Sequence, residues 1–204
     1  MNTIKHEASC SLPTRWATFE LHAFTDTSPV ANGKEHIALV LGKFSPQTPT
    51  LVRIHSECMT GDTLFSLKCD CGPQLESALQ KIASNGHGIL LYLRQEGRGI
   101  GLVNKIKAYK LQEEGADTVE ANRMLGLADD TRDYTMCKPM LEFFNVHSVQ
   151  LLSNNPEKVM ALEQLGFQVQ RLNHSVKANP FNQDYLQTKE KKMGHLGKIE
   201  KSVF

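Results

Sequence analysis

The strongest constraint on the fold is a cluster of three cysteines, because side chains that share one metal ion must meet in space. Cys58, Cys69 and Cys71 lie within one polar stretch, and the chain has only two other cysteines. Thiolates are soft donors that suit zinc, and a zinc ion on three protein ligands keeps one coordination place open for water. The spacing therefore predicts a metal site that can do chemistry rather than a closed structural one.

Two other interpretations of this region stay open. A single buried cysteine is usually only a small apolar side chain, although three in one short polar stretch favour metal binding. His55 is the obvious candidate for a fourth ligand, but a lone histidine on a strand is more often simply hydrogen-bonded. We therefore expect water, and not His55, in the fourth position.

The composition excludes several classes of protein. Of the 204 residues, 40% are hydrophobic and 22% are charged, which is typical of a globular domain. A formal net charge of +1 predicts no nucleic-acid partner. No apolar run approaches the roughly 20 residues that cross a bilayer, and the amino terminus lacks the pattern of a signal peptide. We therefore expect a cytoplasmic protein with no membrane partner and with reduced cysteines.

The first third of the chain is predicted to be rich in β-strands. Short apolar or alternating runs cover residues 17–24, 36–41 and 50–55, and turn-forming residues separate them. An antiparallel meander of these three strands is the simplest arrangement. From Pro73 onward, an apolar stripe with helical period predicts a helix that stops near residues 85–86.

The rest of the chain follows the strand, loop and helix order of α/β proteins. The predicted elements are a strand over 88–94, a glycine-rich loop over 95–101, helices over 102–111, 117–125 and 134–144, a strand over 148–152, a helix over 158–165 and a strand over 167–171. The last two strands should pair in parallel. We expect a single α/β domain over residues 1–204, with a core of about 12–196 and a loose tail over 197–204. Its mixed β-sheet would carry flanking helices and the N-terminal antiparallel meander.

Several loop residues have side chains that suit a nucleotide. The loop from Glu96 to Gly101 matches neither common phosphate-binding motif. One interpretation is therefore that its glycines simply turn the chain and bind no ligand. A bare backbone at a helix start can also approach phosphates, with Arg98 adding a bidentate charge. Glu96 suits an amine-bearing base such as guanine, but taken alone it is better explained as a solvated carboxylate. Spacing also leaves the role of the charged link over 129–133 open.

Taken together, these segments resemble the GTP cyclohydrolase II family. The resemblance runs from about Leu12 to Leu196 and is strongest from Arg53 to Lys158. The segments that carry it are residues 53–58, 60–62, 66–72, 94–101, 118–122, 132–133 and 154–156. Departures are few: Ser153 stands where the family commonly has threonine, and Cys137 has no assigned role.

The resemblance implies a reaction and the residues that carry it out. Members of the family hydrolyse GTP to a diaminopyrimidine ribosyl phosphate, releasing formate and pyrophosphate, as the first step of riboflavin biosynthesis. It also implies a homodimer, one zinc ion per subunit on Cys58, Cys69 and Cys71, and Mg²⁺ on the triphosphate. The implied catalytic residues are Asp130, Arg132 and Tyr109. The residues implied to bind GTP are Arg53, Ile54, His55, Ser56, Glu57, Gln74, Glu96, Gly97, Arg98, Thr118, Ser153 and Lys158.

The implied roles suit the chemistry of these side chains. Zinc makes hydroxide available near neutral pH for attack on C8 of guanine and then on the formamide. Tyr109 would donate a proton to the leaving nitrogen or orient it. Arg132 either stabilises charge at the α-phosphate or attacks it with Asp130 as base, and both roles stay open. The rival functions are a cyclohydrolase that stops at the formamide and a non-catalytic regulator that binds zinc and GTP.

Overall fold

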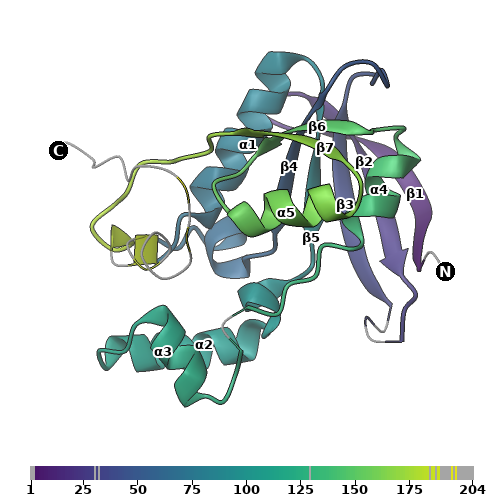
Figure 1. The fold of residues 1–204 in the computed structure, drawn as a ribbon. Helices are drawn as coiled ribbons and strands as arrows, with labels where there is room; N and C mark the ends of the chain where they lie inside the picture. Colours follow the sequence, from purple (N-terminus) through teal and green to yellow (C-terminus); the bar gives the residue numbers. More distant parts are fainter. Residues whose placement is uncertain are drawn as a thin grey trace. The chain divides into compact units, whose positions relative to one another are not determined.

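The computed structural model describes residues 3–29, 31, 33–128, 130–183, 185, 186, 188, 194 and 196. The described residues form two compact units (Figure 1). The first, here called the sheet unit, comprises Met1–His55, Glu76–Arg94 and Asp133–His174. The second, here called the cysteine unit, comprises Ser56–Leu75, Gln95–Arg132 and Ser175–Phe204. The loose tail predicted over 197–204 lies outside the described residues.

The sheet unit is built on a mixed β-sheet. In the described part of the chain its seven strands are ordered β1-β2-β3-β5-β4-β6-β7. They are β1 (Ile4–Pro13), β2 (Thr18–Asp26), β3 (Lys34–Leu41), β4 (Thr50–Ser56), β5 (Gly88–Leu93), β6 (Ser148–Leu152) and β7 (Gln168–Leu172). The pairs β1–β2, β2–β3 and β3–β5 are antiparallel, whereas β4–β6 and β6–β7 are parallel. The predicted mixed α/β sheet is thus confirmed, as is the parallel pairing of the last two strands.

The antiparallel meander has different members from those predicted. It consists of β1, β2 and β3, whereas β4, predicted as its third strand, is separated from β3 by β5. β4 is buried along almost its whole length, as is usual for a strand covered on both faces. β1 is exposed at most positions and lacks the apolar alternation that reveals a strand in a sequence. For this reason the prediction omitted β1 and assigned β4 to the wrong part of the sheet.

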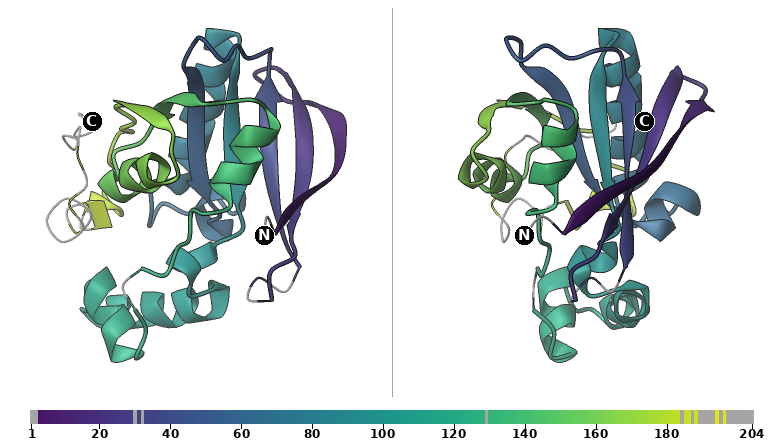
Figure 2. Two further views of the ribbon diagram at one scale, coloured as in Figure 1. Left: turned by 45° about the vertical axis from the view of Figure 1, so that its right-hand side comes forward. Right: turned by 90° about the vertical axis from the view of Figure 1, so that its right-hand side faces the viewer.

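Three helices belong wholly or partly to the sheet unit: α1 (Cys71–Asn85), α4 (Cys137–Phe143) and α5 (Pro156–Gln164). Of the predicted stripe of Leu75, Ala78, Leu79 and Ile82, α1 buries the last three and leaves Leu75 half-buried, and it ends where Gly86 takes a left-handed φ of 77°. α4 and α5 lie on the same side of the sheet (Figure 2). α4 starts three residues later than predicted, and α5 starts two residues earlier.

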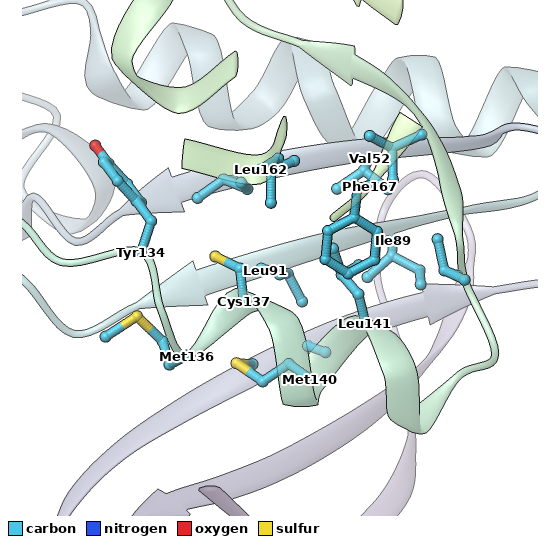
Figure 3. Close-up of a cluster of buried hydrophobic side chains, with 14 of the residues drawn as sticks. Val52, Ile89, Leu91, Tyr134, Met136, Cys137, Met140, Leu141, Leu162 and Phe167 are labelled. Atoms are coloured by element: carbon cyan, nitrogen blue, oxygen red, sulfur yellow. The ribbon is translucent and has the colours of Figure 1, made fainter. Parts of the chain in front are cut away.

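The main apolar cluster of the sheet unit lies between the sheet and the helices α4 and α5 (Figure 3). Val52 from β4 and Ile89 from β5 are completely buried there, as are Met140 and Leu141 from α4. Cys137 is also completely buried in this cluster. The cysteine that had no assigned role therefore packs as a small apolar side chain.

The cysteine unit is built mainly from helical elements. They include the single-turn π-helix η1 (Met59–Thr63), the 3-10 helix η2 (Glu96–Gly99), α2 (Leu102–Glu113) and α3 (Thr118–Met124). A capping box fixes the start of α3, because Asp117 accepts from the N–H groups of Val119 and Glu120, and Glu120 accepts from that of Asp117. Within the described residues, every helix is too short or too polar to span a bilayer.

Candidate functional site

The three predicted cysteines converge in the cysteine unit. Their Sγ atoms all lie within 4.8 Å of one another, and those of Cys58 and Cys69 are 3.7 Å apart. Cys58 immediately precedes η1, and Cys71 begins α1. Among the described residues, no other group of three or more His, Cys, Asp or Glu side chains has this arrangement. The donor atoms and their proximity are those of a thiolate metal centre.

Two glycines allow the sulfur atoms to come so close. A Cβ atom on Gly61 would lie 2.7 Å from Cys69 Sγ and 3.2 Å from Cys58 Sγ. A Cβ atom on Gly72 would lie 2.3 Å from the carbonyl oxygen of Gly61. Both contacts are shorter than packed side chains allow, so each position requires glycine. The turn predicted over 60–62 is therefore part of the wall of the metal centre.

Lys105 of α2 provides a buried positive charge beside the cysteines. Its Nζ donates to Cys58 Sγ at 3.1 Å, to Thr60 Oγ1 at 2.9 Å and to Glu96 Oε1 at 2.8 Å. Burial by itself would lower the Lys105 pKa, but the charge of Cys58 and the hydrogen bond to Glu96 outweigh it and raise this pKa. Sequence reasoning missed this residue, because nothing local distinguishes it from Lys107, which faces solvent on the same helix.

The three thiols differ in acidity. The Cys58 pKa is lowered by hydrogen bonds from the thiols of Cys69 and Cys71, against the effect of burial, and Lys105 lowers it further. The hydrogen bond with Cys58 raises the Cys69 pKa to about 11, and the Cys71 pKa is raised for the same reason. The contact with Lys105 therefore favours a thiolate at Cys58, and a bound cation would displace the remaining thiol protons.

Tyr109 lies beside the same cluster. It follows Lys105 by one helical turn, and the Lys105 Nζ lies 5.7 Å from the centroid of its ring. Burial raises the Tyr109 pKa to about 12, although the charge of Lys105 opposes the increase. The phenol therefore stays protonated at neutral pH and can donate a proton or a hydrogen bond.

The Glu96 carboxylate is held by backbone groups around the cluster. Its Oε2 accepts from the Met59 N–H at 2.6 Å, and its Oε1 accepts from the Gly97 N–H at 2.8 Å as well as from Lys105. Because a carboxylate oxygen can accept about two hydrogen bonds, Oε2 retains one acceptor position in this set of contacts. Glu96 is therefore a fixed carboxylate rather than a solvated one.

Arg98 and the charged link that follows α3 are joined through Thr131. The carbonyl oxygen of Arg98 accepts from Thr131 N at 3.0 Å and from Thr131 Oγ1 at 3.1 Å. A Cβ atom on Gly99 would lie 2.2 Å from Thr131 Oγ1, so glycine permits this approach. Arg98 has a left-handed φ of 59°, and its Nη1 and Nη2 are buried without a hydrogen-bond partner among the described residues.

Asp130 and Arg132 form an ion pair within this link. Arg132 Nε donates to both carboxylate oxygens of Asp130, at 2.9 and 3.0 Å, and Arg132 Nη2 donates to Oδ2. Burial tends to raise the Asp130 pKa, but the hydrogen bonds and charge of Arg132 lower it overall. Asp130 is thus an ionised carboxylate that orients Arg132.

Other predicted residues of the cysteine unit are placed by their own elements. Gln74 Nε2 donates to Asp70 Oδ2 at 2.5 Å at the start of α1. Thr118 occupies the first position of α3, and Glu57 lies half-buried next to Cys58. The Ser56 hydroxyl is buried and has no hydrogen-bond partner within the described part of the chain.

The sheet unit brings together a second group of predicted residues near the carboxyl ends of β4 and β6. Arg53 Nη1 donates to the carbonyl oxygen of Leu152 at 2.8 Å, and Lys158 Nζ donates to that of Ile54 at 2.9 Å. The Ser153 hydroxyl accepts from Asn155 N at 3.1 Å. Parallel strands commonly bind ligands at this end, and two buried cations there suit an anion.

His55 is also buried in the sheet unit, where its ring stacks on that of Tyr92 with centroids 5.5 Å apart. Histidines on strands commonly pack in this way. We still predict that water, and not His55, is the fourth ligand of the metal.

Fold and site together define an α/β protein with a three-cysteine candidate metal centre. The family profile described as GTP cyclohydrolase II matches residues 5–173. The chain is 58% identical over 189 residues to GTP cyclohydrolase-2 of Colwellia psychrerythraea, covering 92% of each chain. It is 55% identical over 195 residues to GTP cyclohydrolase-2 of Shewanella woodyi, covering 95% of this chain and 94% of the relative. The chain belongs to the GTP cyclohydrolase II family.

Among solved structures, a two-domain 3,4-dihydroxy-2-butanone 4-phosphate synthase from A. baumannii aligns with a TM-score of 0.45 and 20% sequence identity. The alignment covers 86% of this chain and 41% of that chain.

Proposed function

We propose that this chain is a zinc-dependent GTP cyclohydrolase II that converts GTP to a diaminopyrimidine ribosyl phosphate, formate and pyrophosphate, at the start of riboflavin biosynthesis. The observation that carries the proposal is the convergence of Cys58, Cys69 and Cys71 beside the protonated phenol of Tyr109. Membership of the family supports the enzyme class. The family resemblance also supports a cytoplasmic homodimer and Mg²⁺ on the triphosphate, which we propose on that basis.

The residues present fit a zinc ion. Three sulfur donors lie within 4.8 Å of one another, and Gly61 leaves open the space that a Cβ atom would fill beside two of them. Cys58, Cys69 and Cys71 would hold the ion. When bound, zinc on three protein ligands supplies Lewis acidity and an acidified water near neutral pH.

Tyr109 and Glu96 would act on the guanine end of the substrate. Tyr109, with a pKa of about 12, donates a proton or a hydrogen bond at the nitrogen that leaves C8. Glu96 is fixed by Met59, Gly97 and Lys105, and its remaining acceptor position on Oε2 suits the exocyclic amine of guanine. The fixed carboxylate would therefore select an amine-bearing base.

Arg132 would act on the phosphate end, and its ion pair supports a charge-stabilising role. Nucleophilic attack would require Asp130 to take a proton from the Arg132 guanidinium. That transfer is strongly unfavourable, because the reference pKa is about 3.9 for Asp and above about 12 for Arg. The Asp130 pKa is lowered further by Arg132 itself. Arg132 therefore stays charged and is oriented by Asp130 toward developing negative charge.

The remaining residues implied to bind GTP supply charge and hydrogen bonds. Arg98 offers a guanidinium whose terminal nitrogens have no hydrogen-bond partner among the described residues. We propose phosphate as the ligand of Arg98 and Lys158, because buried cations favour an anionic ligand. The other proposed GTP ligands are Arg53, Ile54, His55, Ser56, Glu57, Gln74, Gly97, Thr118 and Ser153.

The test is to incubate zinc-loaded protein with GTP and Mg²⁺ and to measure formate, pyrophosphate and the product mass. We expect both small products and a deformylated pyrimidine. A product that retains its formyl group would support the cyclohydrolase that stops early. Stoichiometric GTP binding without pyrophosphate release would support the regulator and contradict the proposal. Light scattering on the same sample tests the homodimer.

A further inference from the structure

Among the lysine and arginine residues of the cysteine unit that the structure describes, only Lys105 is buried, and none of the roles above accounts for it. It is only 9% exposed. Its ammonium lies between Cys58, which precedes η1, and Glu96, which begins η2. One side chain from α2 therefore contacts both the candidate metal centre and the carboxylate proposed to select guanine.

We propose that Lys105 is a positioning residue that couples the metal-binding sulfur of Cys58 to the Glu96 carboxylate. It reduces electron donation by that sulfur to the metal, and it fixes Glu96 for the base. This inference rests on the proposed function, since it concerns how the same site is tuned.

Charge balance supports the first part of the inference. A divalent cation held by three thiolates has a net charge of −1, and a buried charge without compensation is strongly unfavourable. The ammonium at 3.1 Å from Cys58 Sγ neutralises that charge. An N–H···S hydrogen bond also withdraws electron density from the sulfur, which leaves the metal a stronger Lewis acid. Lys105 would thereby offset the weak Lewis acidity that three thiolate ligands confer.

The donor count supports a role that acts through other residues. An ammonium has three N–H donors, and Lys105 has three acceptors: Cys58 Sγ, Thr60 Oγ1 and Glu96 Oε1. Every donor is therefore used within the protein. Because Glu96 Oε1 is also occupied by the Gly97 N–H, the contact with Lys105 directs the remaining capacity of this carboxylate to Oε2.

The experiment uses Co²⁺ as a spectroscopic substitute for zinc in the full chain. Lys105→Met keeps an unbranched side chain one atom shorter and removes the charge and the donors, whereas Lys105→Arg keeps the charge. Lys107→Met, on the exposed face of the same helix, is the matched control. The readouts are the energy of the sulfur-to-cobalt charge-transfer band, the zinc affinity from competition with a chromophoric chelator, and KM and kcat for GTP. Circular dichroism checks the fold of each variant.

In Lys105→Met we expect the charge-transfer band to move to lower energy, because a thiolate without its hydrogen bond is a better electron donor. Zinc affinity should nevertheless fall by about 10- to 100-fold, because the buried centre with its net negative charge loses the compensating ammonium. KM for GTP should rise because Glu96 is no longer fixed. Lys105→Arg should lie between Lys105→Met and the parent protein, and Lys107→Met should match the parent.

Two failures can be told apart. If the parent protein binds Co²⁺ without a thiolate charge-transfer band, the proposed metal centre is wrong. If the parent shows the band but Lys105→Met leaves its energy and the zinc affinity unchanged, the proposed function stands and the inference about Lys105 is overturned. Should Lys105→Met not fold, Lys105→Leu, which likewise removes the charge and the donors, takes its place, and an unchanged band energy and zinc affinity in that variant would overturn the inference equally.

Discussion

The molecule buries cysteine in two regions and uses it in opposite ways. In the cysteine unit, Cys58 is 5% exposed and lies 3.1 Å from the ammonium of Lys105, and its pKa is lowered. In the sheet unit, Cys137 is completely buried among apolar side chains, and burial raises its pKa to about 12. The two side chains are buried to a similar degree, but their neighbours differ. Charged and hydrogen-bonding neighbours, rather than burial, therefore decide whether a cysteine can bind a metal.

Backbone crowding separates the two regions as well. The cysteine cluster depends on Gly61, where a Cβ atom would lie 2.7 Å from Cys69 Sγ. Around Cys137, in contrast, the packing comes from large side chains such as Met140 and Leu141. A thiolate centre requires the removal of side-chain volume around the sulfur, and an apolar core requires that this volume be filled.

The largest expected effect comes from breaking the cluster itself, with Cys69→Ser or the same change at Cys58 or Cys71. Closed zinc sites with four ligands bind with about 10–16 kcal/mol, so the loss of one ligand should weaken zinc binding by about 100-fold or more. Formate release should disappear while some pyrophosphate release remains, because the two reactions occur at opposite ends of GTP. Zinc content by mass spectrometry, together with assays of both products, checks this. A zinc-free protein that no longer binds GTP would contradict the division of labour.

The next effect tests the crowding, with Gly61→Ala. Overpacking typically costs about 1–3 kcal/mol. If that whole cost is subtracted from the free energy of zinc binding, the zinc affinity falls by about 5- to 150-fold. The measurement is competition with a chromophoric chelator. An affinity equal to that of the parent protein would show that the cluster can widen without loss, and the contrast with the apolar core would then be weaker than we infer.

A pH-dependent effect is expected in the sheet unit, which has its own buried titratable group. His36 is completely buried, burial lowers its pKa from 6.5 to about 4, and its Nδ1 accepts a hydrogen bond from Arg94 N at 3.1 Å. Below pH 6.5 the unfolded chain takes up a proton that the folded chain does not. The stability should therefore fall between pH 6.5 and 4, by up to about 3 kcal/mol.

The matched variant for this prediction is His36→Asn, whose amide oxygen can accept the same hydrogen bond. It should flatten the pH dependence of the urea midpoint, measured by circular dichroism on metal-free protein. An equally steep dependence in the variant would assign the effect to other groups.

The smallest effect is expected for Cys137→Ala, which completes the comparison of the cysteines. Removing one buried sulfur should lower the free energy of unfolding by about 1 kcal/mol, comparable to the loss of one or two methylene groups. Zinc stoichiometry and formate release should not change. A loss of zinc similar to that of Cys69→Ser would break the distinction between the two regions.

The sequence was sufficient for those parts of the fold and site whose signals are local. The stripe of α1, the buried strand β5 and the order of the elements after residue 85 are encoded by neighbouring residues, and the three cysteines lie within 14 positions of one another. The insertion of β5 between β3 and β4 depends on which distant strands pair, and no single segment encodes that choice. Lys105 was missed for the same reason, because its partner Cys58 lies 47 residues away.

The backbone at Arg98 has a consequence for the engineering of this protein. Its φ of 59° and ψ of 34° suit glycine, whereas an L-side chain there costs about 1 kcal/mol. A redesign guided only by thermal stability would therefore favour Arg98→Gly, which relieves the strain and removes a buried guanidinium. A screen of variants for heat resistance alone would then remove Arg98, the side chain proposed to bind phosphate. Such a screen therefore needs turnover of GTP as a second criterion.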